Sequence, residues 1–304
     1  MLEHYRRQVQ LLVNVLPYIA AESVFALKGG TAINLFYRDL PRLSVDIDLT
    51  YLPLSSREQA LEGIDESLNR IVANIGKYMP RVHAQRISGR GNHETRILLS
   101  EGSTRVKVET SPVARGVVSK PRTLSATKPV IDMFGFVQVT AVSFEDLFAG
   151  KLHAALDRQH PRDLYDIKLL YENEGLTDEL FRVLMVYVAS SARPVHELLA
   201  PQRLLDKQLF EQEFVGMTTR PVHFLELVDV RARLHAEIRS RLTDNIAHFL
   251  LSLHEADPDF AAIGLPQAET LPAVRWKVMN LQQLKRTDPV KHREQRTLLT
   301  QLFE

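Results

Sequence analysis

The chain has 304 residues, which is long enough for one large domain or two smaller ones. It contains no cysteine, which excludes disulfide bonds and thiolate metal sites and favours a cytoplasmic protein. The 38 basic and 37 acidic side chains leave a net charge of +1, so bulk electrostatics do not predict a polyanion binder, and no apolar run is long enough to span a membrane.

The first half of the chain alternates between helical and strand-like patterns. Apolar side chains at helical spacing predict a helix over residues 4–21 rather than a signal peptide. Further helices are predicted at 31–36 and from an N-cap at 55–56 to residue 78. Strands are predicted at 24–27, 46–51, 81–87, 95–99, 105–109 and 136–139, with turn-forming residues at 89–92.

The pattern changes near residue 143. An N-cap with an acidic first turn predicts a helix over residues 143–158, and Pro161 begins a second helix that ends near residue 171. Helices joined by short loops follow residue 177. We therefore predict an α+β chain, with an α/β lobe over residues 1–142 and a helical lobe over residues 143–304.

A glycine pair and an aspartate pair form the first candidate site. Gly29 and Gly30 open a helix, where backbone N–H groups and the helix dipole favour a phosphate. Asp46 and Asp48 alternate along a predicted strand, so their carboxylates point the same way, and a divalent ion such as Mg²⁺ relieves their repulsion. Each signal alone is weak, because Gly-Gly is often a tight turn and alternating acids usually face solvent. Together they predict nucleotide chemistry.

Neighbouring residues extend this site. Arg42 and Ser44 come just before the acids and are expected either to bind phosphate or to fix the loop. Strict alternation along the predicted strand at 105–109 places Glu109 on its polar face. If that strand lies next to the one that carries the aspartates, Glu109 becomes a third carboxylate that shares the metals or accepts a proton from the attacking hydroxyl. The alternative is a solvated surface glutamate.

A third group of charged residues lies further along the chain. Lys151 and Arg158 are two turns apart on one helical face and form a cationic edge suited to triphosphate oxygens. Asp163 is expected to orient one of these two cations, and Arg162 and Asp166 are spaced for a helix salt bridge. The structural alternative is a set of surface ion pairs on a helical hairpin.

The end of the chain is locally basic and is a candidate surface for nucleic acid. Its basic residues are Arg275, Lys277, Lys285, Arg286, Lys291, Arg293 and Arg296. A solvated helical surface explains the same composition.

These motifs resemble the AbiEii toxin family of nucleotidyltransferases, which belongs to type IV toxin–antitoxin and phage abortive-infection systems and is related to the MenT toxins. The segments that carry the resemblance are Lys28–Ala32, Arg42–Leu49, Lys107–Glu109, Lys151–Asp166 and Leu271–Lys277. They span nearly the whole chain.

The resemblance implies a polymerase-β-like nucleotidyltransferase lobe with a mixed sheet, and a helical lobe that completes the active-site cleft. It implies Mg²⁺ or Mn²⁺ as the metal and transfer of NMP from an NTP to an RNA acceptor, with tRNA expected, so that growth is blocked. It also implies a cognate antitoxin as a partner and no association with a membrane.

The candidate site residues follow from the motifs and the resemblance together. The expected metal ligands are Asp46, Asp48 and Glu109. The expected nucleotide-binding residues are Lys28, Gly29, Gly30, Thr31, Ser44, Lys151 and Arg158. Lys151, Asp163 and Asp166 complete the expected catalytic set with the three metal ligands.

Two other functions stay open at this point. The same fold can nucleotidylate a protein or a small molecule, and the chain can be a non-catalytic nucleotide-binding module on a transferase scaffold. The basic carboxyl-terminal segment favours RNA over a small acceptor. The joint presence of Asp46, Asp48, Glu109 and Lys151 favours catalysis over binding alone.

Overall fold

The computed structural model describes residues 3–87, 95–200 and 204–304, and the turn expected at 89–92 lies outside them. The chain divides into two compact units. Met1–Leu147 and Gly216–Arg220 form the first unit, and Phe148–Val215 and Pro221–Glu304 form the second.

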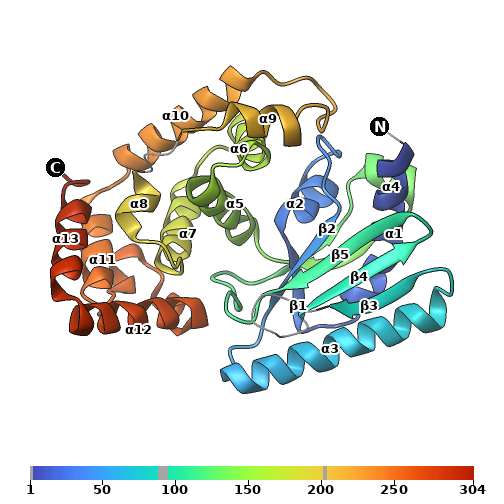
Figure 1. Ribbon diagram of the computed structural model, residues 1–304, viewed down its shortest axis with the longest axis horizontal. Helices are drawn as coiled ribbons and strands as arrows, with labels where there is room; N and C mark the ends of the chain where they lie inside the picture. The colour runs from blue at the N-terminus through green and yellow to red at the C-terminus, as the bar shows by residue number, and fades with distance from the viewer. Residues whose placement is uncertain (1–2, 88–94, 201–203) are drawn as a thin grey trace. The chain divides into compact units, whose positions relative to one another are not determined.

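A mixed sheet of seven strands is the centre of the first unit, as far as the described residues show (Figure 1). Its order is β3-β4-β5-β2-β1-β7-β6, in which the β1–β7 and β2–β5 pairs are parallel and the other pairs antiparallel. The strands are β1 (Phe25–Lys28), β2 (Asp46–Tyr51), β3 (His83–Ile87), β4 (Arg96–Glu101), β5 (Thr104–Thr110), β6 (Arg122–Ser125) and β7 (Gln138–Ala141). The mixed sheet followed by helices confirms the predicted α+β fold.

Two long helices pack on this sheet. α1 (Glu3–Ala20) contacts β5 and β7 through an apolar stripe that includes Val9, Leu12 and Leu16, all fully buried. α3 (Arg57–Tyr78) contacts β3, as Figure 1 shows along the edge of the sheet. It begins with a capping box, in which Ser56 and Gln59 each accept from the other's backbone N–H.

The central strands separate an apolar face from a polar face. Ile47 and Leu49 of β2 and Val106 and Val108 of β5 are almost completely buried. Each such side chain contributes about 1.5–3 kcal/mol to stability when it leaves water. Because successive side chains alternate across a strand, the residues between them face the opposite side of the sheet, where the polar groups collect.

The segment at 111–135, for which the sequence predicted no regular structure, holds β6 and α4 (Lys128–Phe134). β6 pairs with β7, and Thr123 lies opposite Thr140. The strand is largely exposed and lacks apolar alternation, so its pattern gave no signal. Its structure depends on pairing with a strand that follows it in the chain.

A distant piece of chain also belongs to the first unit. Thr218 forms a β-bridge with Arg42, and the N–H of Leu43 donates to the carbonyl of Met217 at 2.8 Å. The N–H of Thr219 donates to the carbonyl of Pro41 at 2.9 Å. The loop that precedes β2 is therefore held by residues about 175 positions later in sequence.

Helices make up the second unit. They begin with α5 (Phe144–Arg158), which starts in the first unit and continues into the second. The other α-helices are α6 (Pro161–Asn173), α7 (Asp178–Ala189), α8 (Val195–Leu199), α9 (Lys207–Glu213), α10 (Phe224–Ser240), α11 (Asp244–His254), α12 (Pro272–Thr287) and α13 (Pro289–Thr300). Two 3₁₀ turns, Phe260–Ile263 and Pro266–Thr270, join α11 to α12. No helix among the described residues is long and apolar enough to cross a bilayer.

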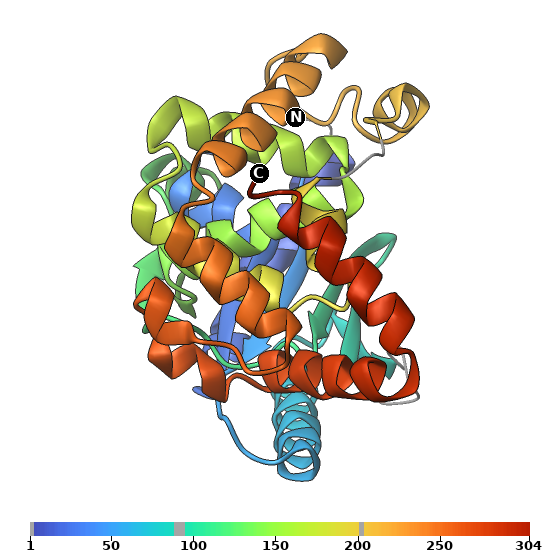
Figure 2. The same ribbon diagram turned by 90° about the vertical axis from the view of Figure 1, so that its left-hand side faces the viewer.

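The last three helices pack together around two histidines. α12 and α13 form a hairpin, drawn in red in Figure 2, and α11 packs against both. His254 and His292 are buried and stack with their ring centroids 4.2 Å apart. Nε2 of each ring donates to the main-chain carbonyl of the other residue, at 2.9 and 3.0 Å. This reciprocal pair satisfies buried polar groups that would otherwise cost stability.

Candidate active site

The two aspartates of β2 project from the polar face of the sheet. Asp46 is exposed and Asp48 is partly buried, while Ile47 between them is buried on the opposite face. β2 runs parallel to β5, with Asp48 beside Glu109 and Asp46 beside Lys107. The three carboxylates expected from the sequence therefore lie on one face of two neighbouring strands.

Glu109 is already bound by two cations. Its Oε1 lies 2.5 Å from Nε of Arg96 and 3.2 Å from Nζ of Lys107. Lys28 stands opposite Asp48 on β1, so a row of charged side chains crosses four strands, with the two acids side by side and a cation at each end: Lys28, Asp48, Glu109 and Arg96. Burial lowers the pKa of the Lys28 ammonium, and the Asp48 charge opposes that shift. The roles of Glu109 as metal ligand or base stay predictions, and they require it to release these cations.

The glycine turn presses against the acid and the loop before it. Gly29 has φ of +75°, and a Cβ at this position would clash with Oδ2 of Asp48 and lie 3.0 Å from its Cβ. A Cβ on Gly30 would lie 2.6 Å from Oγ of Ser44 and 2.7 Å from Nη2 of Arg42. The turn therefore brings bare backbone next to a carboxylate on one side and to a hydroxyl and a guanidinium on the other.

We expect Gly29→Ala to disable this site. The added methyl group would force Asp48 aside in a left-handed backbone conformation that costs alanine about 1–2 kcal/mol. Chemical denaturation and nucleotide-transfer assays should both show a loss. Gly76→Ala is the matched control, since Gly76 lies on the exposed side of α3 with nothing within 4 Å of the added atom. Alanine favours a helix more than glycine does, so this variant should gain up to about 1 kcal/mol of folding stability. Equal behaviour of the two variants would contradict the assigned role of the turn.

Hydrogen bonds fix this turn to β2. Thr31 is fully buried, and its hydroxyl donates to the carbonyl of Asp46 at 2.6 Å. The side-chain amide of Asn34 donates to the carbonyl of Gly30 at 2.6 Å. Asn34 was not among the residues expected from the sequence, although a lone amide four residues after a glycine pair, in an apolar helical segment, was a usable signal.

The loop before β2 is held from two sides. Arg42 is buried and its Nη1 donates to the carbonyl of Leu43 at 2.8 Å, which agrees with the predicted loop-fixing role. The phenol oxygen of Tyr5, on α1, accepts from the N–H of Ser44 at 2.8 Å and lies 3.3 Å from the carbonyl of Arg42. No local pattern marked Tyr5, because its contact is made across 39 residues of sequence.

The second charged cluster lies in the second unit, between α5 and α6. Nζ of Lys151 lies 3.0 Å from Oδ1 of Asp163 and 3.0 Å from Oδ2 of Asp166. The two aspartate side chains are about 1% and 0% exposed, and the lysine side chain 9%. The surface salt bridge expected between Arg162 and Asp166 is therefore replaced by a buried one, in which Asp166 faces α5 because it shares a helical face with Asp163.

Arg158 completes this cluster from its exposed side. Its Nε lies 2.6 Å from Oδ2 of Asp163 and its Nη2 lies 2.9 Å from Oδ1, which is a bidentate pair. Burial would raise the pKa of Asp163, but Lys151 and Arg158 outweigh that effect and hold it well below its usual range. Asp163 was expected to orient one of these two cations, and it contacts both. Because Lys151 is bound to two carboxylates, its role at a triphosphate stays a prediction.

The acid pair of β2 fits a divalent ion brought with a nucleotide. Among the described residues, no group of three or more His, Asp or Glu side chains is placed to hold a metal. Mg²⁺ is commonly bound by one or two carboxylates with water and substrate phosphate, rather than by a complete protein cage. Asp46 and Asp48 supply hard oxygen ligands of this kind beside the glycine turn, whose role at a phosphate stays a prediction.

The sequence of this chain matches a known protein family. Residues 10–280 match the family described as nucleotidyl transferase AbiEii toxin, type IV toxin–antitoxin system. The chain belongs to this family. The match spans the acid pair, the glycine turn and the Lys151 cluster, and it confirms the resemblance seen in the sequence motifs.

A solved structure supports the fold of this AbiEii family member. MenT4, a nucleotidyltransferase toxin from Mycobacterium tuberculosis H37Rv, is similar with a TM-score of 0.63. The likeness covers 89% of this chain and 93% of MenT4 at 18% sequence identity. No curated protein matches the sequence.

Proposed function

We propose that this AbiEii family protein transfers an NMP group from an NTP to an RNA acceptor, with tRNA as the acceptor, and so arrests growth. The observation that carries the proposal is the placement of Asp46 and Asp48 on one face of β2, with Gly29 packed against Asp48. Nucleotide transfer needs a phosphate-binding segment next to metal-binding carboxylates, and we assign these two roles to the glycine turn and to the acid pair of β2.

The transfer step breaks one phosphoanhydride bond and forms one ester bond. A hydroxyl oxygen of the acceptor attacks the α-phosphorus of the NTP, the bond from that phosphorus to the β-phosphate oxygen breaks, and pyrophosphate leaves. The hydroxyl proton passes to a base, and we assign this role to Glu109. Glu109 must first release Arg96 or Lys107, so that its carboxylate can accept the proton of the acceptor hydroxyl. Released from Glu109, either cation becomes available to phosphate oxygens.

Other side chains serve to bind and orient the nucleotide. We assign to Asp46 and Asp48 the binding of Mg²⁺ or Mn²⁺, which when bound neutralises phosphate charge and lowers the pKa of the attacking hydroxyl. Gly30 and Ser44 belong to the turn and loop proposed to hold phosphate, and Lys28 adds a cation next to Asp48. Thr31, whose buried hydroxyl binds the carbonyl of Asp46, serves to fix this turn to β2. Arg158, whose side chain is 61% exposed, is the accessible cation proposed for the triphosphate, and Asp163 orients it.

The carboxyl-terminal helices supply a candidate RNA surface. Arg286, Lys291 and Arg293 are exposed, and no ion pair to them occurs in the described part of the chain. Lys285 and Arg296 are exposed too, but both bind Glu255. Lys277, counted in this basic segment from the sequence, is buried and does not contribute to it.

We expect Arg286→Gln, Lys291→Gln and Arg293→Gln together to weaken tRNA binding and to lower its salt dependence. Removing one cation that binds a phosphate should reduce the slope of log K against log salt by roughly one. Filter binding at several salt concentrations measures this. The control neutralises Arg7, Lys128 and Lys207, which are exposed but paired with acids on their own helices. A slope that is the same in both triple variants would exclude this face as the RNA surface.

Nucleotide transfer itself is tested with purified protein, Mg²⁺, total tRNA and each α-labelled NTP in turn. Label on RNA supports the proposal. Label on protein, or on a small molecule in a cell extract, would replace RNA by that acceptor. Nucleotide binding without any transfer would favour a binding module.

A further inference from the structure

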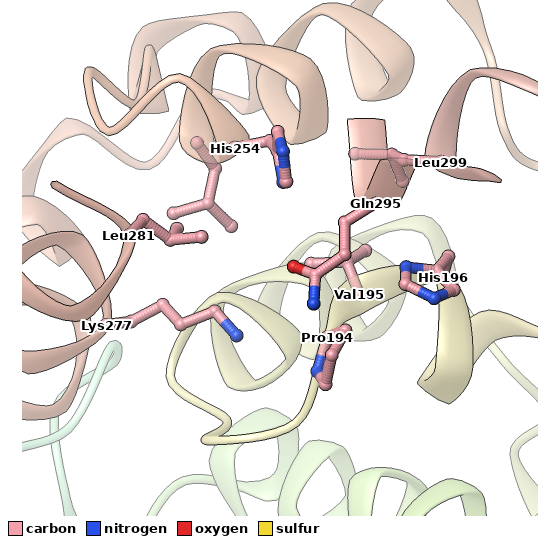
Figure 3. A pocket seen from close by; sticks show the side chains of 9 residues that line it. Pro194, Val195, His196, His254, Lys277, Leu281, Gln295 and Leu299 are labelled. Carbon is pink, nitrogen blue, oxygen red and sulfur yellow. The ribbon is translucent and has the colours of Figure 1, made fainter. Parts of the chain in front are cut away.

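A small cavity lies in the second unit, where α8, α11, α12 and α13 meet (Figure 3). Its volume is about 10 Å³, close to the space that one water molecule requires. Lys277 extends toward its centre from α12, and Gln295 reaches it from α13 (Figure 3). Pro194 and Leu281 are among the apolar residues that complete the lining.

Lys277 is a buried cation with too few partners. It is only 6% exposed, and its Nζ donates one hydrogen bond, to the carbonyl of Arg193 at 2.6 Å. A lysine ammonium has three donors. In the described ranges, no carboxylate lies within ion-pair distance of it, whereas the similarly buried Lys151 binds two.

The other titratable groups around the cavity do not neutralise this charge. Nε2 of His254 is committed to the carbonyl of His292, and burial lowers the pKa of His254. Burial also lowers the pKa of His196, on α8. Glu197 is exposed and acts on Lys277 only from beyond ion-pair distance. A buried ammonium in such surroundings favours an anion as its missing partner.

We propose that this cavity binds one chloride ion between the Lys277 ammonium and the Gln295 amide. The cavity admits a single atom of that size, and a tetrahedral phosphate or sulfate does not fit. The bound anion links α8, α12 and α13, because Lys277 also holds the carbonyl of Arg193 just before α8. It would therefore stabilise the carboxyl-terminal helices.

The charge of Lys277 makes this site dependent on pH. Burial lowers the pKa of Lys277 to about 8, and Glu197 partly offsets the shift. An anion binds the protonated amine, so its affinity should be full below that pKa and fall by about tenfold for each pH unit above it. This dependence distinguishes the cavity from exposed lysines, which titrate at higher pH.

Chloride NMR line broadening with the full-length protein at pH 7 tests the proposal. We expect broadening in the wild type that bromide, which is also a single atom, reverses and inorganic phosphate at equal ionic strength does not. Lys277→Met should weaken the interaction by at least about tenfold, since it removes a charge-assisted hydrogen bond of about 1.5 kcal/mol or more. Lys285→Met, on the exposed side of the same helix, should leave it unchanged.

The outcome is decided without relying on one variant. Should Lys277→Met fail to fold, the wild type measured at pH 7 and pH 9.5 gives the same comparison, with loss of broadening expected at the higher pH. Broadening that persists in Lys277→Met or at pH 9.5, that phosphate reverses as well as bromide does, or that is absent from the wild type would overturn the proposal.

Discussion

Asp48→Asn should lower the rate of NMP transfer by about a thousandfold or more, which corresponds to roughly 4 kcal/mol of lost transition-state stabilisation. The substitution keeps the shape of the side chain and removes the charge that faces the glycine turn. The pair with Asp46 is then reduced to one carboxylate, so metal affinity and charge stabilisation fall together. Single-turnover transfer of labelled NMP measures the change, and induced expression in bacteria should give arrest with the wild type only.

The control for Asp48→Asn is Asp132→Asn. Asp132 is an exposed carboxylate on α4 of the same unit, where it pairs with Lys128. Its loss should change neither transfer nor growth arrest. The role proposed for Asp48 fails if the asparagine variant retains full transfer activity, or if it arrests growth as strongly as the wild type while transfer is lost. The second result would favour binding over chemistry.

Local patterns predicted the strand that carries the acids very closely. β2 spans Asp46–Tyr51 as expected, because its alternation, Ile47 and Leu49 inside and Asp46 and Asp48 outside, is complete within one segment. The long helix that follows was equally clear, since its capping box and its apolar stripe are both local. Structural features that depend only on neighbouring residues could therefore be predicted from the sequence.

Features that depend on distant partners were not available. β6 exists because β7 pairs with it, and the loop before β2 is fixed by Met217 and Thr219 from far along the chain. Sequence alternation placed Glu109 on the polar face. That Arg96 stands opposite Glu109 and binds it becomes visible only when the pairing of β4 with β5 is known. The predicted carboxylate was thus placed correctly while its existing partners were missed.

The basic residues show the same limit. Lys277 and Lys285 are both lysines on α12, yet one is buried with a carbonyl partner and the other is exposed and paired with Glu255. Charge counting cannot separate them. Burial of their helix against α13 decides which contributes to a surface potential and which becomes an internal group with a lowered pKa.

Lys151→Met should destabilise the second unit by about 3–5 kcal/mol, because it removes the ammonium that two buried carboxylates share. Chemical denaturation measures this loss. Lys207→Met is the control, since Lys207 forms an exposed pair with Glu211 on one helix and should cost at most about 1 kcal/mol. If Lys151→Met lowered the free energy of unfolding by no more than the control does, the buried cluster would not stabilise the second unit as expected.

The cluster should also make stability depend on pH. The pKa of Asp163 is lower in the folded protein than the ordinary aspartate value of 3.8, so the unfolded chain binds this proton more readily. The stabilisation is therefore fully present above that value and is lost as pH falls through the folded pKa. Asp163→Asn should flatten the acid limb of the stability curve, and an unchanged limb would show that this carboxylate is not the group held in its charged form.

A double variant separates stability from nucleotide binding at Lys151. In Lys151→Met with Asp166→Asn, one buried charge of each sign is removed, so much of the lost stability should return. If Lys151 also binds the triphosphate of the NTP, the stabilised double variant should show a raised KM for NTP. A lysine with a purely structural role would leave KM as in the wild type. The same measurement with Asp166→Asn alone assigns any remaining change to the lysine, because that variant keeps the ammonium and its contact with Asp163.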